Sequence, residues 1–100
     1  MAIYQVLYWQ EIPSQVSARE AGKSHKEMLS QRFQELIDIV ATKRKLTESD
    51  SYIAGWSKGD KTERPGNALD VAKAVAAEIE ERFEAIRAAA LVGPAASDGG

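Results

Sequence analysis

The sequence contains no cysteine and only one histidine, His25. Without thiols the chain has no disulfide, no thiolate metal site and no cysteine nucleophile. Met28 and Leu29 stand three and four residues after His25, so this side chain has no second metal ligand at helical spacing. The acidic residues are spaced as on solvated surfaces, and we find no catalytic pattern. We therefore expect no catalytic residue, no metal and no cofactor, and we expect that the protein is not an enzyme.

Neither sign of charge dominates, since 13 basic and 15 acidic side chains leave a net charge of −2. That balance provides no long-range attraction to nucleic acid or to an anionic membrane. The sequence also lacks a long uncharged apolar run, and its first residues do not have the pattern of a signal peptide, so we expect no membrane insertion. The glycines Gly55, Gly59 and Gly66 do not form a phosphate-binding loop. A cytoplasmic protein is the expectation.

The 100 residues are enough for one domain, and 44% of them are apolar. We predict a single α+β domain over residues 1–92. Gly93 and Pro94 are expected to end regular structure, and the small, polar residues that follow predict a flexible C-terminal tail over 93–100.

The segment Ile3–Trp9 is rich in β-branched and aromatic residues and predicts the central strand. Both of its faces are apolar, with Ile3, Leu7 and Trp9 on one side and Tyr4, Val6 and Tyr8 on the other. Residues 11–14 contain a proline and predict a turn. Residues 15–20 then predict a shorter strand that pairs back as a hairpin, and its polar composition suits a sheet edge.

Two amphipathic helices follow from apolar residues at helical spacing. The first is expected over 24–43, because Ser24 and Glu27 have the spacing of a capping box. The second is expected from an Asn67 cap to about residue 90. Its predicted apolar stripe is Leu69, Ala72, Val75, Ala76, Ile79, Phe83 and Ile86.

Between these helices, residues 52–56 favour a strand that places Tyr52, Ala54 and Trp56 on one face. A helical turn that brings Tyr52 beside Trp56 remains open as the alternative. A turn over 57–61 leads to a possible strand over 62–64. The expected order is strand, strand, helix, strand, possible strand, helix. This order predicts a two-layer sandwich in which two helices pack on a small, mostly antiparallel sheet of three to four strands.

Two helices cover only one face of such a sheet, so the second apolar face of the first strand is expected to meet a partner. If Ile3, Leu7 and Trp9 pack on the helices, then Tyr4, Val6 and Tyr8 face outward. In the opposite arrangement Trp9 and its neighbours take that role. The leading hypothesis is a non-catalytic interaction or accessory domain that binds a protein partner, either a second copy or a larger complex, through this face or an edge strand. The expected contact residues are Tyr4, Val6, Tyr8, Trp9, Tyr52 and Trp56.

Two other functions are weighed against this hypothesis. The first is a small-molecule-binding or enzyme-accessory domain, with an aromatic pocket between sheet and helices that contains Trp9 or Trp56. The second and weaker one is nucleic-acid binding by residues 43–45 with Lys58 and Lys61, next to Tyr52 and Trp56. Acidic neighbours of these cations, such as Asp60 and Glu63, dilute their field.

Three short motifs are distinctive. The first is Tyr8-Trp9 with Ile12-Pro13 and Gln15-Val16. The second is Arg32-Phe33 with Ile37-Asp38, and the third is Asp50, Tyr52 and Trp56. Together they resemble a small bacterial family of domains described as virulence factors. The resemblance covers residues 4 to about 86 and implies no catalytic residues. In some relatives a similar domain lies in a longer chain with helical repeats, which implies an accessory or interaction role. The long, alanine-rich last helix and the Gly-Pro tail depart from the shortest members, so the resemblance implies no function for the C-terminal third.

Overall fold

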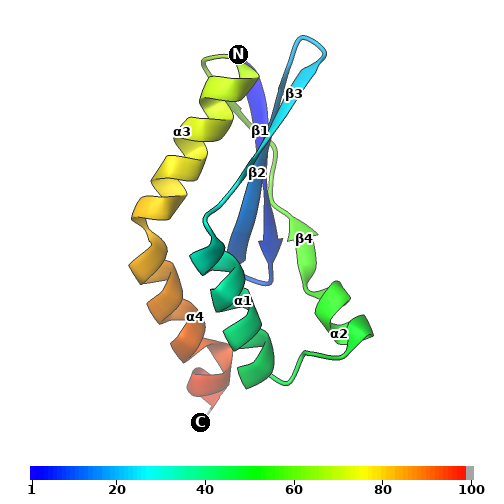
Figure 1. Cartoon of the computed structure of the whole chain (residues 1–100), viewed down its shortest axis with the longest axis vertical. Coiled ribbons are helices and arrows are strands. Elements are labelled where there is room, and N and C mark those ends of the chain that lie inside the picture. The colour runs from blue at the N-terminus through cyan, green and yellow to red at the C-terminus, as the bar shows by residue number, and fades with distance from the viewer. Residues whose placement is uncertain (99–100) are drawn as a thin grey trace.

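A computed structural model describes the backbone of residues 1–98 and the side chains of residues 1–92. The described part contains five strands and four helices (Figure 1). In chain order they are β1 (Ala2–Trp9), β2 (Ile12–Glu20), β3 (Lys23–Met28), α1 (Gln31–Lys43), α2 (Ser49–Ala54), β4 (Trp56–Lys58), β5 (Thr62–Arg64), α3 (Ala68–Glu81) and α4 (Phe83–Asp98).

Strand β1 is the centre of an antiparallel sheet, as its composition predicts. On one side β2 pairs with β1 and β3 pairs with β2. On the other side β4 pairs with the second half of β1 and β5 pairs with its first half. The edge position predicted for β2 is therefore wrong, because β3 lies outside it. The polar residues of β2 instead belong to a face of the sheet that the helices do not cover.

The β1–β2 hairpin turns earlier than predicted. Its turn residues are Gln10 and Glu11, and Gln10 has a positive φ of 53°. Pro13 lies inside β2 opposite Tyr8, where the register shifts by a bulge. Proline has no amide hydrogen to donate to the ladder, so a bulge is a position where a strand tolerates it.

The first helix begins later than predicted, because residues 23–28 form strand β3. Ala21 and Gly22 have φ values of 50° and 81° and close a two-residue turn between β2 and β3. Glu27 does not cap a helix; its Oε1 lies 2.9 Å from Nε2 of His25, two residues away on the same side of the strand. Helix α1 starts at Gln31 and ends at Lys43, and its end was correctly predicted. Pairing with β2 outweighs the local capping pattern.

The predicted strand over 52–56 is also wrong, and the helical alternative is confirmed. Helix α2 ends at Ala54, and β4 starts only at Trp56. The rings of Tyr52 and Trp56 are 6.2 Å apart between centroids. Gly55 closes the helix directly against the indole of Trp9, where a side chain would not fit.

The second predicted helix is two helices. Asn67 caps α3 as expected, since its Oδ1 accepts a hydrogen bond from the amide of Asp70. Helix α3 ends at Glu81, Arg82 separates the two helices, and α4 starts at Phe83. Helix α4 continues through Gly93 and Pro94 to Asp98, so regular structure does not end at residue 93. Pro94 has no amide hydrogen for the carbonyl of Ala90, and Nη2 of Arg44 donates to that carbonyl at 3.0 Å. The last two residues of the predicted tail, 99–100, lie outside the described part.

The expected two-layer α+β sandwich is confirmed, with more elements than predicted. In Figure 1 α3 lies along the left side of the sheet and α1 lies at its lower end, and α3 packs along β1, β2 and β3. The core between the layers is built from Val6, Val16, Phe33, Ile37 and Val71, all at most 7% exposed. Within the described residues, no helix is both long and apolar enough to cross a membrane.

Candidate functional site on the open face of the sheet

The two faces of β1 have different surroundings. Val6 is buried, and Tyr4 and Tyr8 are half-buried on the same side, toward α3. Ile3 is 43% exposed on the other side. Of the two arrangements considered from the sequence, the tyrosines therefore take the helix side, and an exposed face of Tyr4, Val6 and Tyr8 is not formed. The reason is that small residues on α3, such as Ala72, bring this helix close to that face.

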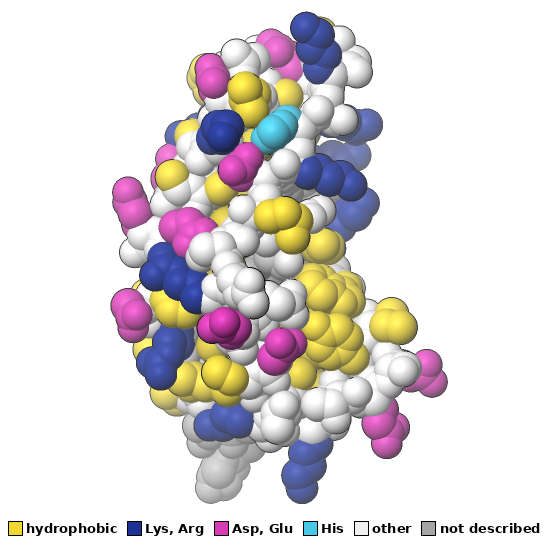
Figure 2. Space-filling view, in the orientation of Figure 1, with side chains coloured by type: hydrophobic (Ala, Val, Ile, Leu, Met, Phe, Trp, Pro, Cys, Tyr) yellow, Lys and Arg dark blue, Asp and Glu magenta, His cyan; other side chains and the backbone are white. Residues whose placement is uncertain are grey.

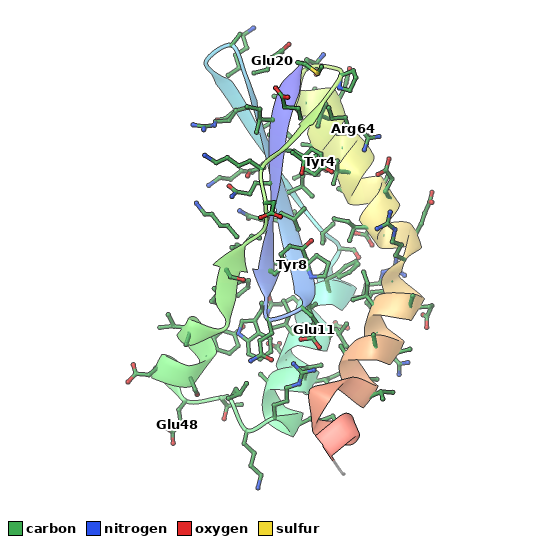
Figure 3. The ribbon with its side chains drawn as sticks, turned by 180° about the vertical axis from the view of Figure 1, so that it is seen from behind. Tyr4, Tyr8, Glu11, Glu20, Glu48 and Arg64 are labelled. Atoms are coloured by element: carbon green, nitrogen blue, oxygen red, sulfur yellow. The ribbon has the colours of Figure 1, made fainter. Side chains whose placement is uncertain are left out.

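Tyr4 and Tyr8 instead line a cleft of about 290 Å³ between β1 and α3. Figure 3 shows both rings on the side of β1 that faces α3. At the mouth, Arg64 donates two hydrogen bonds to Glu78, at 3.0 and 2.7 Å. The cleft occupies the position predicted for an aromatic pocket, but Trp9 and Trp56 do not line it. Its volume is at the lower limit for small-molecule sites, and much of its lining is polar.

Trp9 belongs to the core. It is fully buried, and its indole Nε1 donates a hydrogen bond of 2.8 Å to the carbonyl of Tyr52. Its ring lies 5.5 Å from that of Tyr52. Because the polar group of Trp9 is satisfied within the fold, this residue has a structural role and holds α2 against the end of β1.

The opposite face of the sheet is open and basic. Alternate residues of four strands and the loop after β4 line a hollow of about 480 Å³ on this face. We call this surface the basic face, and it consists of Ile3, Gln5, Ser17, Arg19, Ser24, Lys26, Lys58 and Lys61. In Figure 2, Lys and Arg side chains gather along the right-hand margin of the upper half. From behind, several nitrogen-tipped side chains project together from the sheet, away from Tyr4 and α3 (Figure 3).

The four cations of the basic face, Arg19, Lys26, Lys58 and Lys61, form no ion pair with any side chain that the structure describes. Three arginines elsewhere do form ion pairs, Arg32 with Glu80, Arg44 with Glu11 and Arg64 with Glu78, whereas Arg82 and Arg87 on the helices are in no ion pair of the described residues. Glu63 pairs opposite Ile3 in register and stands at the rim of the same face. The small net negative charge therefore conceals a local excess of cations on this face of the sheet, with Glu63 at its rim.

An apolar border adjoins the basic face. Leu7 pairs with Gln15 on one side and with Lys58 on the other, and Gln15 pairs with Met28. Met28 is 65% exposed. Trp56 is half-buried and stands two residues before Lys58, on the same side of β4. The apolar border next to the lysines is therefore made of Leu7, Met28 and Trp56. Of the predicted contact residues, Trp56 belongs to this border, and Tyr52 lies against Trp56.

The sequence predicted only part of this arrangement. The basic patch considered for nucleic-acid binding grouped Lys58 and Lys61 with residues 43–45. Lys58 and Lys61 lie on the basic face, and so do Arg19 and Lys26, which that patch did not include. The polar alternation of residues 15–20 was the available signal for Arg19, and it was interpreted as a sheet edge. Residues 43–45 do not join the patch. Hydrogen bonds to Glu11 raise the pKa of Arg44, whose side chain is only 13% exposed.

The fold and this surface define the class: a small α+β domain whose sheet leaves one basic face open. Residues 7–92 match the family described as "Virulence factor", and the chain belongs to that family. No curated protein and no solved structure matches the chain. The family's description names no activity and no binding partner.

Proposed function

We propose that the protein is a non-catalytic interaction domain and that the basic face binds an acidic segment of a protein partner. The observation that carries this proposal is the set of four unpaired cations on one open sheet face. Charge complementarity selects an acidic partner and disfavours a basic one. Within the described residues no group of three or more histidine, cysteine or acidic side chains is placed to hold a metal ion.

A protein segment fits this surface better than a nucleic acid does. The cations adjoin Leu7, Met28 and Trp56, which offer contact area to an apolar side chain. Trp and Met are enriched in protein–protein interfaces. Within the hollow itself no aromatic side chain is present on which a base would stack. The net charge of −2 also opposes the approach of a long polyanion.

A binding assay with a designed peptide tests the proposal. The probe is a fluorescein-labelled peptide of sequence Thr-Leu-Thr-Glu-Thr-Glu-Thr, which combines acidic and apolar side chains. Its affinity is measured by fluorescence anisotropy for the wild-type protein, for Lys58→Glu/Lys61→Glu, and for the control Lys73→Glu/Arg87→Glu on the helices. Both double variants change the net charge by the same amount. We expect the first to weaken binding about tenfold and the second to leave it nearly unchanged.

Equal losses in both double variants would show that only the overall charge matters, and this would refute the proposal. The proposal is likewise refuted if the protein binds single-stranded DNA or RNA through these lysines but does not bind the peptide. Thermal unfolding of each variant serves as the folding control. The lysines are exposed, and their substitution is expected to change stability by less than about 0.5 kcal/mol.

A further inference from the structure

We infer that the acidic segment binds as an added strand along the free edge of β3. This inference rests on the proposed function and specifies how that partner is held. In the described part of the chain β3 pairs with β2 alone, so its outer edge carries no strand. An open edge is a template for main-chain hydrogen bonds with an extended peptide.

The hairpin geometry identifies which backbone groups point outward. The two-residue turn at Ala21 and Gly22 makes Glu20 and Lys23 a hydrogen-bonded pair. Hydrogen-bonded and non-hydrogen-bonded pairs alternate along an antiparallel ladder. The amide of Leu29 donates to the carbonyl of Ser14 at 3.1 Å. Leu29 is an even number of residues after Lys23, so this bond agrees with an alternation in which Lys23, His25, Glu27 and Leu29 face β2.

The remaining residues, Ser24, Lys26 and Met28, therefore direct their amide and carbonyl groups away from β2. All three are exposed, whereas His25 and Glu27 between them are half-buried. The same three residues carry their side chains on the side of the basic face. An incoming strand that pairs with them places its own opposite side chains on that face as well.

On the basic face, side chains that are paired across the strands form rows, and each row indicates which side chain the incoming strand should place next to it. The row of Met28 contains Gln15 and Leu7, and it suits an apolar residue. The row of Lys26 suits a carboxylate. In the row of Ser24 the small side chain leaves room for a carboxylate to approach Arg19. The partner segment is thus an extended stretch with one apolar residue followed by acidic residues at every second position, when it runs antiparallel to β3.

A second copy of this chain is a poor occupant of the same edge. Antiparallel pairing of two β3 strands through these outward groups, with Ser24 of each copy opposite Met28 of the other, would place the two Lys26 side chains directly opposite each other. Like charges that face each other across strands destabilise pairing, and lysines are a common protection of edge strands against self-association. The charges that disfavour a second copy favour an acidic strand.

Hydrogen–deuterium exchange of the full chain, with and without the peptide Thr-Leu-Thr-Glu-Thr-Glu-Thr, tests the inference. In the free protein the amides of Ser24, Lys26 and Met28 should exchange fast, and those of His25 and Glu27 slowly. Addition of the peptide should slow the first three. In parallel, Ser24→Pro removes an outward amide without changing charge, and Ser24→Ala is its matched control. We expect Ser24→Pro to weaken binding about tenfold relative to Ser24→Ala.

The outcomes separate the two claims. If the peptide binds and requires Lys58 and Lys61, but the three amides stay unprotected and Ser24→Pro binds as tightly as Ser24→Ala, strand addition is wrong while the proposed function stands. If the peptide does not bind at all, the proposed function fails and this inference fails with it. Circular dichroism confirms that both Ser24 variants remain folded, and the exchange measurement on the wild type needs no variant.

Discussion

The contact between Gly55 and Trp9 makes a prediction in which two effects have opposite signs. The backbone of Gly55 has φ −75° and ψ −18°, which alanine adopts readily. Helix propensity alone therefore predicts that Gly55→Ala stabilises the protein by up to about 1 kcal/mol. A Cβ at this position, however, would lie 2.6 Å from Nε1 and 2.8 Å from Cε2 of the fully buried Trp9.

The steric clash between the new Cβ and the Trp9 indole should outweigh the gain in helix propensity. Overpacking of a core site costs about 1–3 kcal/mol. A displaced indole also weakens its hydrogen bond to Tyr52, at a cost of about 1 kcal/mol. After the propensity gain is subtracted, Gly55→Ala should lose about 1–3 kcal/mol, and a loss of about 2 kcal/mol lowers the Tm of a domain this size by roughly 8–16 °C.

Urea unfolding followed by tryptophan fluorescence measures this loss, and a double-mutant cycle with Trp9→Phe assigns its cause. Phenylalanine lacks the five-membered ring of the indole, which contains the Nε1 and Cε2 atoms that the new Cβ would meet, so Gly55→Ala should cost little in that background. The coupling free energy should then be about 1–3 kcal/mol. A Gly55→Ala protein as stable as the wild type, or the same loss in both backgrounds, would refute the packing of α2 against Trp9.

Three further predictions concern the ion pairs. Arg44→Met keeps the apolar stem but leaves Glu11 and an α4 carbonyl without their donor, and it should cost about 1–2 kcal/mol in thermal unfolding, since Glu11 itself is 41% exposed. Hydrogen bonds from Arg44 hold the pKa of Glu11 below its ordinary 4.5. The contribution of this ion pair to the free energy of unfolding is therefore fully present above pH 4.5 and is lost as the pH falls through the lowered pKa. In acid unfolding, Arg44→Met should not show this pH-dependent loss of stability. Glu80 accepts hydrogen bonds from the amide and hydroxyl of Ser30 at 2.6 and 2.8 Å, so Glu80→Gln should destabilise the start of α1 by about 1 kcal/mol, whereas the exposed control Glu81→Gln should not.

The features that were correctly predicted depend on strong local patterns. The central strand follows from a dense run of β-branched and aromatic residues, and the end of α1 and the cap of α3 follow from side chains next to them in sequence. The failures occurred where a local pattern suits two structures. Ser24 and Glu27 have the spacing of a capping box, yet the turn at Gly22 pairs their segment with β2. Whether residues 24–27 start a helix or pair with β2 depends on the balance between the two structures in the whole fold.

The residues that carry the family resemblance are mainly core residues. Trp9, Ile12, Val16, Phe33 and Ile37 are each at most 1% exposed. They specify how the sheet and helices pack, which explains why the motifs identified the family but not a function. The cations of the basic face come from β2, β3, β4 and the loop after β4, and their proximity depends on strand register. Since register was not predictable from residue types alone, Arg19 and Lys26 could not be grouped with Lys58 and Lys61.

Chemical-shift mapping tests the central claim, that the basic face is the partner-binding surface, most directly. The ¹⁵N-labelled protein is titrated with the peptide Thr-Leu-Thr-Glu-Thr-Glu-Thr, and the amide shifts are followed by NMR. We predict that the largest shifts occur at Gln5, Ser17, Lys26 and Lys58, and that they diminish as salt is added. Shifts that cluster instead around Tyr4 and the cleft beside α3, or the absence of any shift at millimolar peptide, would contradict the account.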